Sequence, residues 1–248
     1  MDLVLQALAL LGDPARWASA DDDGWATQIR DHVVLSAICL AVAALIALPL
    51  GLYVGHTGKG RRVVVPALNV LRALPTFGLF ALLVIVVASL TGAVIPLVLL
   101  GVPSLLAGAY AGLESVDKQT VDAARAVGMT EWQVLGRVEL PLAAPLLLGG
   151  VRAATLQIVA TATLVFFFGY NSLGNSILTG VATRDYPLMI AGALLVTALA
   201  LLLDALLGLV QRFAVPRGVS RGSGSPTTTA RARRGTALPT RTPIPEGN

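Results

Sequence analysis

Long apolar runs separated by short polar stretches dominate the pattern of the chain. A run of about 20 apolar residues is long enough, as a helix, to cross a hydrocarbon core about 30 Å thick. Five runs of this kind follow one another, at residues 33–54, 63–90, 93–113, 145–168 and 187–213. The pattern therefore predicts an all-α polytopic membrane protein with about five transmembrane helices.

The second run, residues 63–90, is interrupted by Arg72 and Pro75. A charged side chain is costly inside a bilayer, and the residue before a proline is biased away from the helical conformation. We therefore expect the first half of the run to form an interfacial or kinked lead-in and residues 76–90 to cross the membrane. Arg72 is expected to extend to the interface, and Pro75 with Thr76 to form a kink.

The two ends of the chain differ from its apolar middle. Residues 1–31 contain an apolar stretch too short to span a bilayer, followed by polar residues, and we expect them outside the membrane or in its interface. Residues 217–248 are rich in Arg, Gly, Ser, Pro and Thr, which predicts a disordered cytoplasmic tail. The arginines of this tail are either solvated or in contact with anionic lipid. The membrane domain is expected at residues 32–216.

Composition supports the membrane class. Hydrophobic residues make up 55% of the chain and charged residues 13%, about half the share typical of soluble domains. The single cysteine, Cys39, lies in an apolar run and is expected to be a buried apolar residue. His32 and His56 flank the first run and are interpreted as interfacial residues, since neither has metal-ligand spacing. The bilayer is the expected surroundings of the chain, and no nucleic-acid partner is expected.

The distribution of basic residues predicts the orientation. All of the 18 Lys and Arg residues except Arg16, Arg30 and Arg184 lie in, or near the membrane end of, the first loop, the segment after the third run and the tail. Because basic loops stay on the cytoplasmic side, these regions are expected in the cytoplasm. With five spans, the N-terminus is then outside and the C-terminus inside, in a multi-pass protein of the cytoplasmic membrane.

A charged segment at residues 117–141 keeps helical periodicity although it interrupts the apolar pattern. Asp117 is placed to cap a first helix, and Gly128 to end it in the left-handed conformation. Thr130 and Gln133 match a capping box for a second short helix, which Pro141 is expected to end. Apolar or small side chains recur every three or four residues and predict one shared helical face, formed by Val121, Ala124, Gly128, Trp132, Leu135 and Val138.

The charged segment resembles the signature of permease subunits of binding-protein-dependent ABC importers. That signature reads Glu-Ala-Ala, three residues, Gly, nine residues, Ile, one residue and Leu-Pro. This chain matches it at the same spacing with Asp122, Ala123, Ala124, Gly128, Val138, Leu140 and Pro141. Asp replaces Glu and Val replaces Ile, which preserves charge and apolar character. The alternative is an ordinary amphipathic loop on the membrane surface, in which Asp122 and Arg125 are merely solvent-facing charges.

The resemblance implies a function for the segment and a set of partners. In this family the segment is a cytoplasmic coupling-helix pair that docks into a cleft of the ATPase subunit. The chain itself has no nucleotide-binding loop, so ATP and Mg²⁺ would be bound by the partner ATPase, and no catalytic, cofactor or metal site is expected in this chain. An extracytoplasmic binding protein would select the substrate. Five spans are too few to enclose a path alone, so a second permease copy or a paralogue is also expected.

More local motifs are similar to the osmoprotectant branch of that family, which imports glycine betaine, choline, carnitine or proline. They are found at residues 32–36, 48–51, 74–76, 150–155 and 160–163. The chain departs from the branch at residues 169–174, where its relatives carry a denser run of glycines. The resemblance therefore supports the permease assignment more firmly than the substrate.

Polar residues at membrane depth are the remaining candidates for function. Arg152 and Asp204 lie at similar depths in the last two runs, and we expect them to form a charge pair. The alternative is that Arg152 extends to the interface while Asp204 contacts a hydroxyl group. Thr161 and Thr163 either line the transport path or make hydrogen bonds between helices. The kink at Pro75 and Thr76 is expected near an inner gate of that path.

The expected function is that of a membrane-spanning permease subunit for an osmoprotectant, driven by a partner ATPase. Three alternatives remain. An importer of the same architecture for methionine or another amino acid is the nearest, an ATP-independent secondary transporter or channel is the second, and a membrane scaffold without transport is the third. The odd number of spans, without a visible inverted repeat, disfavours a repeat-built secondary transporter.

Overall fold

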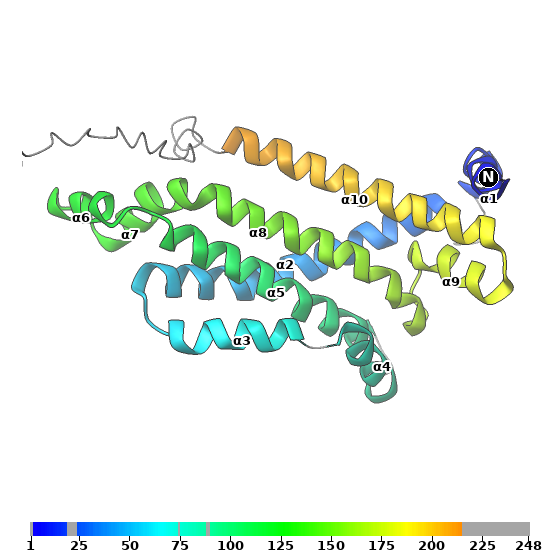
Figure 1. Cartoon of the computed structure of the whole chain (residues 1–248), viewed down its shortest axis with the longest axis horizontal. Helices are drawn as coiled ribbons and strands as arrows, with labels where there is room; N and C mark the ends of the chain where they lie inside the picture. Colours follow the sequence, from blue (N-terminus) through cyan, green and yellow to red (C-terminus); the bar gives the residue numbers. More distant parts are fainter. Residues whose placement is uncertain (1, 19–23, 74, 88–89, 215–248) are drawn as a thin grey trace, which may run out of the picture.

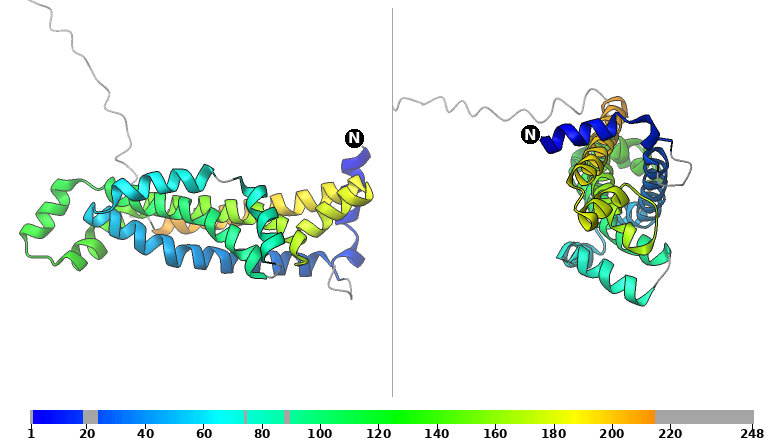
Figure 2. Two further views of the ribbon diagram at one scale, coloured as in Figure 1. Left: turned by 90° about the horizontal axis from the view of Figure 1, so that it is seen from below. Right: turned by 90° about the vertical axis from the view of Figure 1, so that its right-hand side faces the viewer.

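The long helices of the chain lie side by side and define the architecture. The computed structural model describes residues 2–18, 24–73, 75–87 and 90–214, and in these ranges every regular element is helical. The long helices lie along one common axis, as Figures 1 and 2 show, and comprise α2 (Trp25–Thr57), α5 (Leu90–Glu114), α8 (Leu140–Thr161) and α10 (Tyr186–Ala214). The predicted all-α polytopic fold is confirmed.

Four helices among the described residues are long and apolar enough to cross a membrane, and a bent pair makes a fifth candidate. The predicted runs at 33–54, 93–113 and 187–213 lie within α2, α5 and α10. Helix α2 is longer than predicted because residues 25–32 continue the helix with a polar and aromatic sequence. It ends at Gly58, whose φ of 69° lets its backbone N–H bond to the carbonyl of Val54.

The second predicted span is the bent pair. Helices α3 (Arg61–Ala73) and α4 (Thr76–Val86) meet at an angle of 78°, and Pro75 begins α4 in an extended conformation. The predicted kink at Pro75 is therefore present. The prediction that residues 76–90 cross the membrane is wrong, because α4 ends after 11 residues and Leu90 already belongs to α5. A helix of that length is only about 16 Å long, too short to span on its own.

Helix α5 packs between α2 and α8 and forms the centre of the bundle. Glycines allow the closest approach: a Cβ on Gly108 would lie 2.7 Å from the Cα of Gly150, and a Cβ on Gly51 would lie 2.7 Å from the Cβ of Ala109. Small residues at such crossings let helix backbones touch, which is how membrane helices gain packing energy. The fully buried apolar side chains of this core include Leu97, Leu105, Cys39 and Ile158, so the predicted burial of Cys39 is confirmed.

Helix α8 belongs to a longer continuous helix, residues 131–168, which starts well before the predicted run at 145–168. Pro145 lies inside α8 rather than at its start. The helix tightens to 3₁₀ geometry at Ala162–Phe168 and ends at Gly169, which has a φ of 72°. The connection that follows, between α8 and α10, contains the helix α9 (Gly174–Thr183).

The two ends of the bundle carry different elements. The charged segment projects from one end, whereas α1 (Asp2–Leu11) and α9 lie at the other end (Figure 1). Helix α1 packs against α10 through Ala7, which is buried with Trp25 and Ala191. The predicted disordered tail, residues 217–248, lies outside the described residues. The fold thus separates the signature residues from the N-terminal segment by the length of the long helices.

Candidate functional site

The charged segment forms the predicted pair of short helices. Helix α6 (Lys118–Ala126) begins after Asp117, whose carboxylate accepts a hydrogen bond of 3.0 Å from the backbone N–H of Gln119. Helix α7 (Glu131–Val134) begins with the capping box of Thr130 and Gln133. Both predicted caps are therefore confirmed.

Gly128 forms the turn between the two helices. Its φ is 87°, a left-handed conformation that glycine adopts without steric cost, and a Cβ at this position would meet nothing within 4 Å. The constraint on Gly128 is therefore the backbone conformation alone. The structure shows why the residue type at this position of the signature is glycine.

Pro141 does not end the second helix, and that prediction is wrong. A π-helical stretch, Leu135–Glu139, joins α7 directly to α8, and Pro141 lies in the first turn of α8. In the stretch the backbone N–H of Leu140 bonds to the carbonyl of Leu135, five residues back. Wider π turns accommodate a proline ring that an unbroken α-helix would exclude. The charged segment is consequently continuous with a membrane helix.

The predicted shared face of the segment holds only in part. Val121, Ala124 and Val134 are buried in a small apolar cluster with Leu113 and Ala143. Trp132, predicted on the same face, is instead 84% exposed. The predicted period of apolar residues passes through Gly128 as in one continuous helix, but the turn at this glycine reorients α7.

The signature residues occupy different environments in the structure. Asp122, Ala123 and Gly128 are exposed, Ala124 is buried, and Val138, Leu140 and Pro141 are half-buried. Near the exposed members lie two large apolar side chains that are themselves mostly exposed, Val127 at 80% and Trp132 at 84%. Exposed apolar groups of this kind mark surfaces that meet a partner.

Ion pairs hold the two short helices together. The guanidinium group of Arg125 donates two hydrogen bonds of 3.0 Å to the carboxylate of Glu131, and it lies 3.4 Å from a carboxylate oxygen of Asp122. This bidentate contact lowers the pKa of Glu131 and raises the pKa of Arg125. Asp122 and Arg125 are thus solvent-exposed, as the alternative interpretation assumed, and also joined within the segment.

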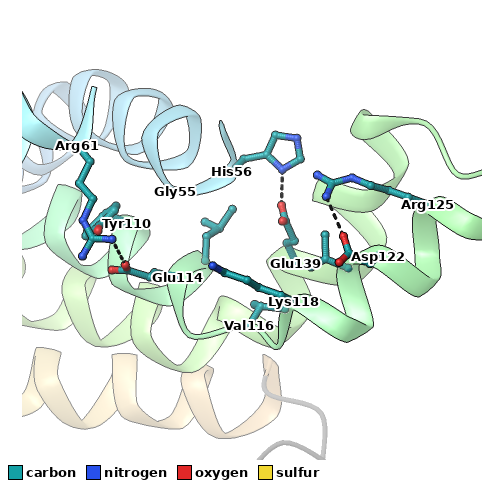
Figure 3. A pocket seen from close by; sticks show the side chains of 12 residues that line it. Gly55, His56, Arg61, Tyr110, Glu114, Val116, Lys118, Asp122, Arg125 and Glu139 are labelled. Carbon is teal, nitrogen blue, oxygen red and sulfur yellow. Dashed lines mark hydrogen bonds and ion pairs between the residues drawn. The ribbon is translucent and has the colours of Figure 1, made fainter. Parts of the chain in front are cut away.

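His56, at the end of α2, reaches the same segment, which sequence reasoning missed. Its Nδ1 lies 2.5 Å from a carboxylate oxygen of Glu139, and its Nε2 lies 3.2 Å from a carboxylate oxygen of Glu131. His56 and Glu139 line a cavity of about 260 Å³ (Figure 3). At another wall of the cavity, Arg61 of α3 forms an ion pair of 2.5 Å with Glu114 of α5. In the sequence, the only sign of these contacts is that a titratable residue, His56, follows an apolar run.

Arg152 and Asp204 meet between α8 and α10. The Nε and Nη2 atoms of Arg152 lie 2.9 and 2.8 Å from the two carboxylate oxygens of Asp204. The Nη1 atom of Arg152 also donates to Gln211, whose amide in turn donates to the carbonyl of Pro145. The structure thus brings together the two charges that the sequence placed at similar depths, and it adds Gln211.

The candidate path residues are not brought together with this pair. The hydroxyl groups of Thr161 and Thr163 donate to the carbonyls of Gln157 and Ala160 in their own helix, rather than to another helix. Pro75 and Thr76 lie at the bend between α3 and α4. For all four residues, a place on the transport path remains a prediction.

His32 also lies at a contact between helices. It is fully buried, and its Nε2 lies 2.9 Å from the carbonyl oxygen of Val159 in α8. His32 is therefore a buried residue of the contact between α2 and α8. The predicted apolar run begins at residue 33, whereas α2 is already packed against α8 one residue earlier.

Comparison with known proteins places these features in a broader context. Residues 47–217 match the family described as "Binding-protein-dependent transport system inner membrane component". The chain is 30% identical over 190 residues to the glycine betaine/carnitine/choline transport system permease protein OpuCB of Bacillus subtilis, covering 76% of this chain and 88% of that protein. It is 36% identical over 191 residues to the osmoprotectant import permease protein OsmY of Salmonella typhimurium, covering 76% and 81%.

A solved structure shares the fold. The chain is similar to a chain of the MetNI methionine ABC transporter in an inward-facing conformation, with a TM-score of 0.65 and 20% identity. The similarity covers 75% of this chain and 94% of the other. At this level of identity the likeness concerns the arrangement of helices alone.

Proposed function

Because the chain belongs to the family of binding-protein-dependent transport system inner membrane components, we propose that it is the permease subunit of an importer for osmoprotectants such as glycine betaine, choline, carnitine or proline. Family membership itself makes the chain a multi-pass inner membrane permease of an ABC importer, without catalytic activity of its own. It also implies an ATPase, which binds ATP, and a substrate-binding protein as partners. An ATP-independent transporter and a scaffold are thereby set aside.

The observation that carries the substrate proposal is the similarity to permeases named for these compounds. Two such proteins are 30% and 36% identical to the chain, and each alignment covers about three quarters of it. The methionine transporter shares the fold at 20% identity, so it gives no argument for methionine as the substrate. Methionine and other amino acids are outcomes that the experiment must separate.

Residues 117–141 are proposed as the segment that receives work from the ATPase. Its exposed tip offers Val127 and Trp132 beside the signature residues Asp122 and Ala123, a mixture of apolar and charged groups suited to a protein cleft. Since residues 131–168 form one continuous helix, a movement of α7 is passed directly to α8. The path itself is proposed to form between two copies of this chain, or this chain and a paralogue.

The proposed orientation places the charged segment in the cytoplasm and the N-terminal segment outside. It is supported by the separation of the two ends along the bundle (Figure 1) and by the basic residues near the charged segment. Residues 1–31 would then form an outer segment, 32–216 the membrane domain and 217–248 a cytoplasmic tail.

The experiment is uptake by proteoliposomes that contain the chain, its ATPase and its binding protein. We expect ATP-driven accumulation of at least one labelled osmoprotectant and none of methionine. Accumulation of methionine alone would contradict the substrate proposal, and uptake without the ATPase would contradict the proposed mechanism.

A further inference from the structure

His56 connects α2 to the charged segment at two separate places. Its Nδ1 lies 2.5 Å from Glu139, in the π-helical stretch, and its Nε2 lies 3.2 Å from Glu131, in α7. A neutral imidazole carries one N–H, whereas the protonated ring donates from both nitrogens. In either state, at least one ring N–H of His56 is thus available to one of the two carboxylates that its ring nitrogens face.

The two carboxylates differ in their surroundings. Glu139 is 5% exposed, and His56 is the side chain that approaches its carboxylate. Glu131 is 59% exposed at its side chain and is also held by Arg125. Losing one partner of a buried charge is costly, whereas water readily replaces a partner at the surface. The contact between His56 and Glu139 is accordingly the more important of the two.

Through His56, the charged segment contacts a third long helix, α2, in addition to α5 and α8. Along the backbone, the segment is continuous with α5 on one side and with α8 on the other. Helix α2 is reached through side chains, in a chain of contacts that runs from Asp122 through Arg125, Glu131 and His56 to Glu139. Such a contiguous network of ion pairs can transmit a displacement between elements.

We propose that His56 is a positioning residue that makes α2 move with the charged segment, so that work delivered by the ATPase reaches α2 as well as α8. The inference rests on the proposed coupling role of residues 117–141. π-Helical turns are rare and frequently occur at functional sites, which agrees with the location of Glu139. The cavity of about 260 Å³ beside His56 leaves room for its partners to shift (Figure 3).

The test compares transport with ATP hydrolysis in the complete importer. In proteoliposomes that hold the chain, its ATPase and its binding protein, the measured quantity is substrate molecules taken up per ATP hydrolysed. We expect His56→Ala to lower this ratio about tenfold while ATP hydrolysis continues, since the buried charge-assisted contact is lost. The matched control is Arg61→Gln, which breaks an ion pair at the same cavity without touching the charged segment, and which should keep the ratio.

Two conservative variants separate the contacts of His56. The amide nitrogen of Asn takes the place of Nδ1 and that of Gln the place of Nε2, so His56→Asn should keep most of the ratio and His56→Gln should lose most of it. Both keep a polar amide at this position and allow the comparison if the alanine variant does not assemble. A merely structural role would instead lower the yield of assembled complex for both variants alike.

An unchanged ratio in His56→Ala, or equal losses in His56→Ala and Arg61→Gln, would overturn the inference. Failure of the proposed function would show differently, as absence of ATP-driven uptake in the wild-type protein.

Discussion

Arg152 and Asp204 form a bidentate ion pair between α8 and α10, with nitrogen to oxygen distances of 2.9 and 2.8 Å. Both side chains are about one-third exposed in the single chain, at 34% and 31%. The guanidinium group also lies over Gly208, where a Cβ would be 3.5 Å from its Cζ. A Cβ at that distance would be in ordinary van der Waals contact, so the ion pair that fastens α10 to α8 does not require a glycine at position 208.

Asp204→Ala is expected to destabilise the protein because it leaves the charge of Arg152 without its main partner. We expect a loss of about 1 to 3 kcal/mol in the free energy of unfolding. In detergent this corresponds to a fall of several degrees in the thermal midpoint. The double variant Arg152→Leu with Asp204→Leu should recover most of the loss, since no unpaired charge remains. An unchanged midpoint in Asp204→Ala would show that the pair does not fasten the two helices.

Adjacent glycines in α8 provide a matched test of the helix crossing. A Cβ at Gly150 would lie 2.8 Å from the carbonyl oxygen of Ser104 and 2.9 Å from the Cα of Gly108, whereas a Cβ at Gly149 would meet nothing within 4 Å. Gly150→Ala should therefore cost about 1 to 3 kcal/mol by forcing α5 and α8 apart. Gly149→Ala should be neutral or slightly stabilising, because alanine favours the helix. Equal thermal midpoints for the two variants would contradict the close crossing.

Gly128→Ala tests the turn between α6 and α7. The conformation at a φ of 87° disfavours any residue with a Cβ, and we expect a cost of about 1 to 2 kcal/mol for the turn. Less ATPase should then co-purify with the chain. Gly136→Ala is the control, since Gly136 lies in the same segment without a positive φ and has open space at its Cβ. The account fails here if both variants retain the ATPase equally.

The sequence was sufficient to predict much of the fold because its information is local. Apolar runs predict α2, α5 and α10, and short-range caps predict the start of α6 at Asp117 and of α7 at Thr130. The break predicted at Pro75 is present, because a proline disturbs a helix whatever the helix packs against. The spacing of the signature also identified the charged segment, because the signature spans only 20 residues of continuous chain and is therefore local.

The errors arose where a distant part of the chain decides the outcome. Pro141 looks like a helix stop, yet a π-helical stretch carries the helix through it, with His56 of α2 bound to Glu139 in that stretch. The error at Trp132 has a local cause instead, because the turn at Gly128 reorients α7 and leaves this side chain facing solvent. The contact of His56 joins residues 83 positions apart, and nothing in the local pattern reports a pairing over such a separation.

The most direct test of the account is cross-linking from the exposed tip of the charged segment. Cys39 is the only cysteine, so Cys39→Ala with Val127→Cys gives a single accessible thiol, and Cys39→Ala with Val181→Cys places an exposed thiol on α9, at the opposite end of the bundle. With a thiol-to-amine reagent, the account predicts a covalent product of the chain and its ATPase for the Val127→Cys variant and none for the Val181→Cys variant. If ATP-driven uptake by the Val127→Cys variant is intact before the reagent is added and no product with the ATPase forms, residues 117–141 are not the site at which the ATPase acts.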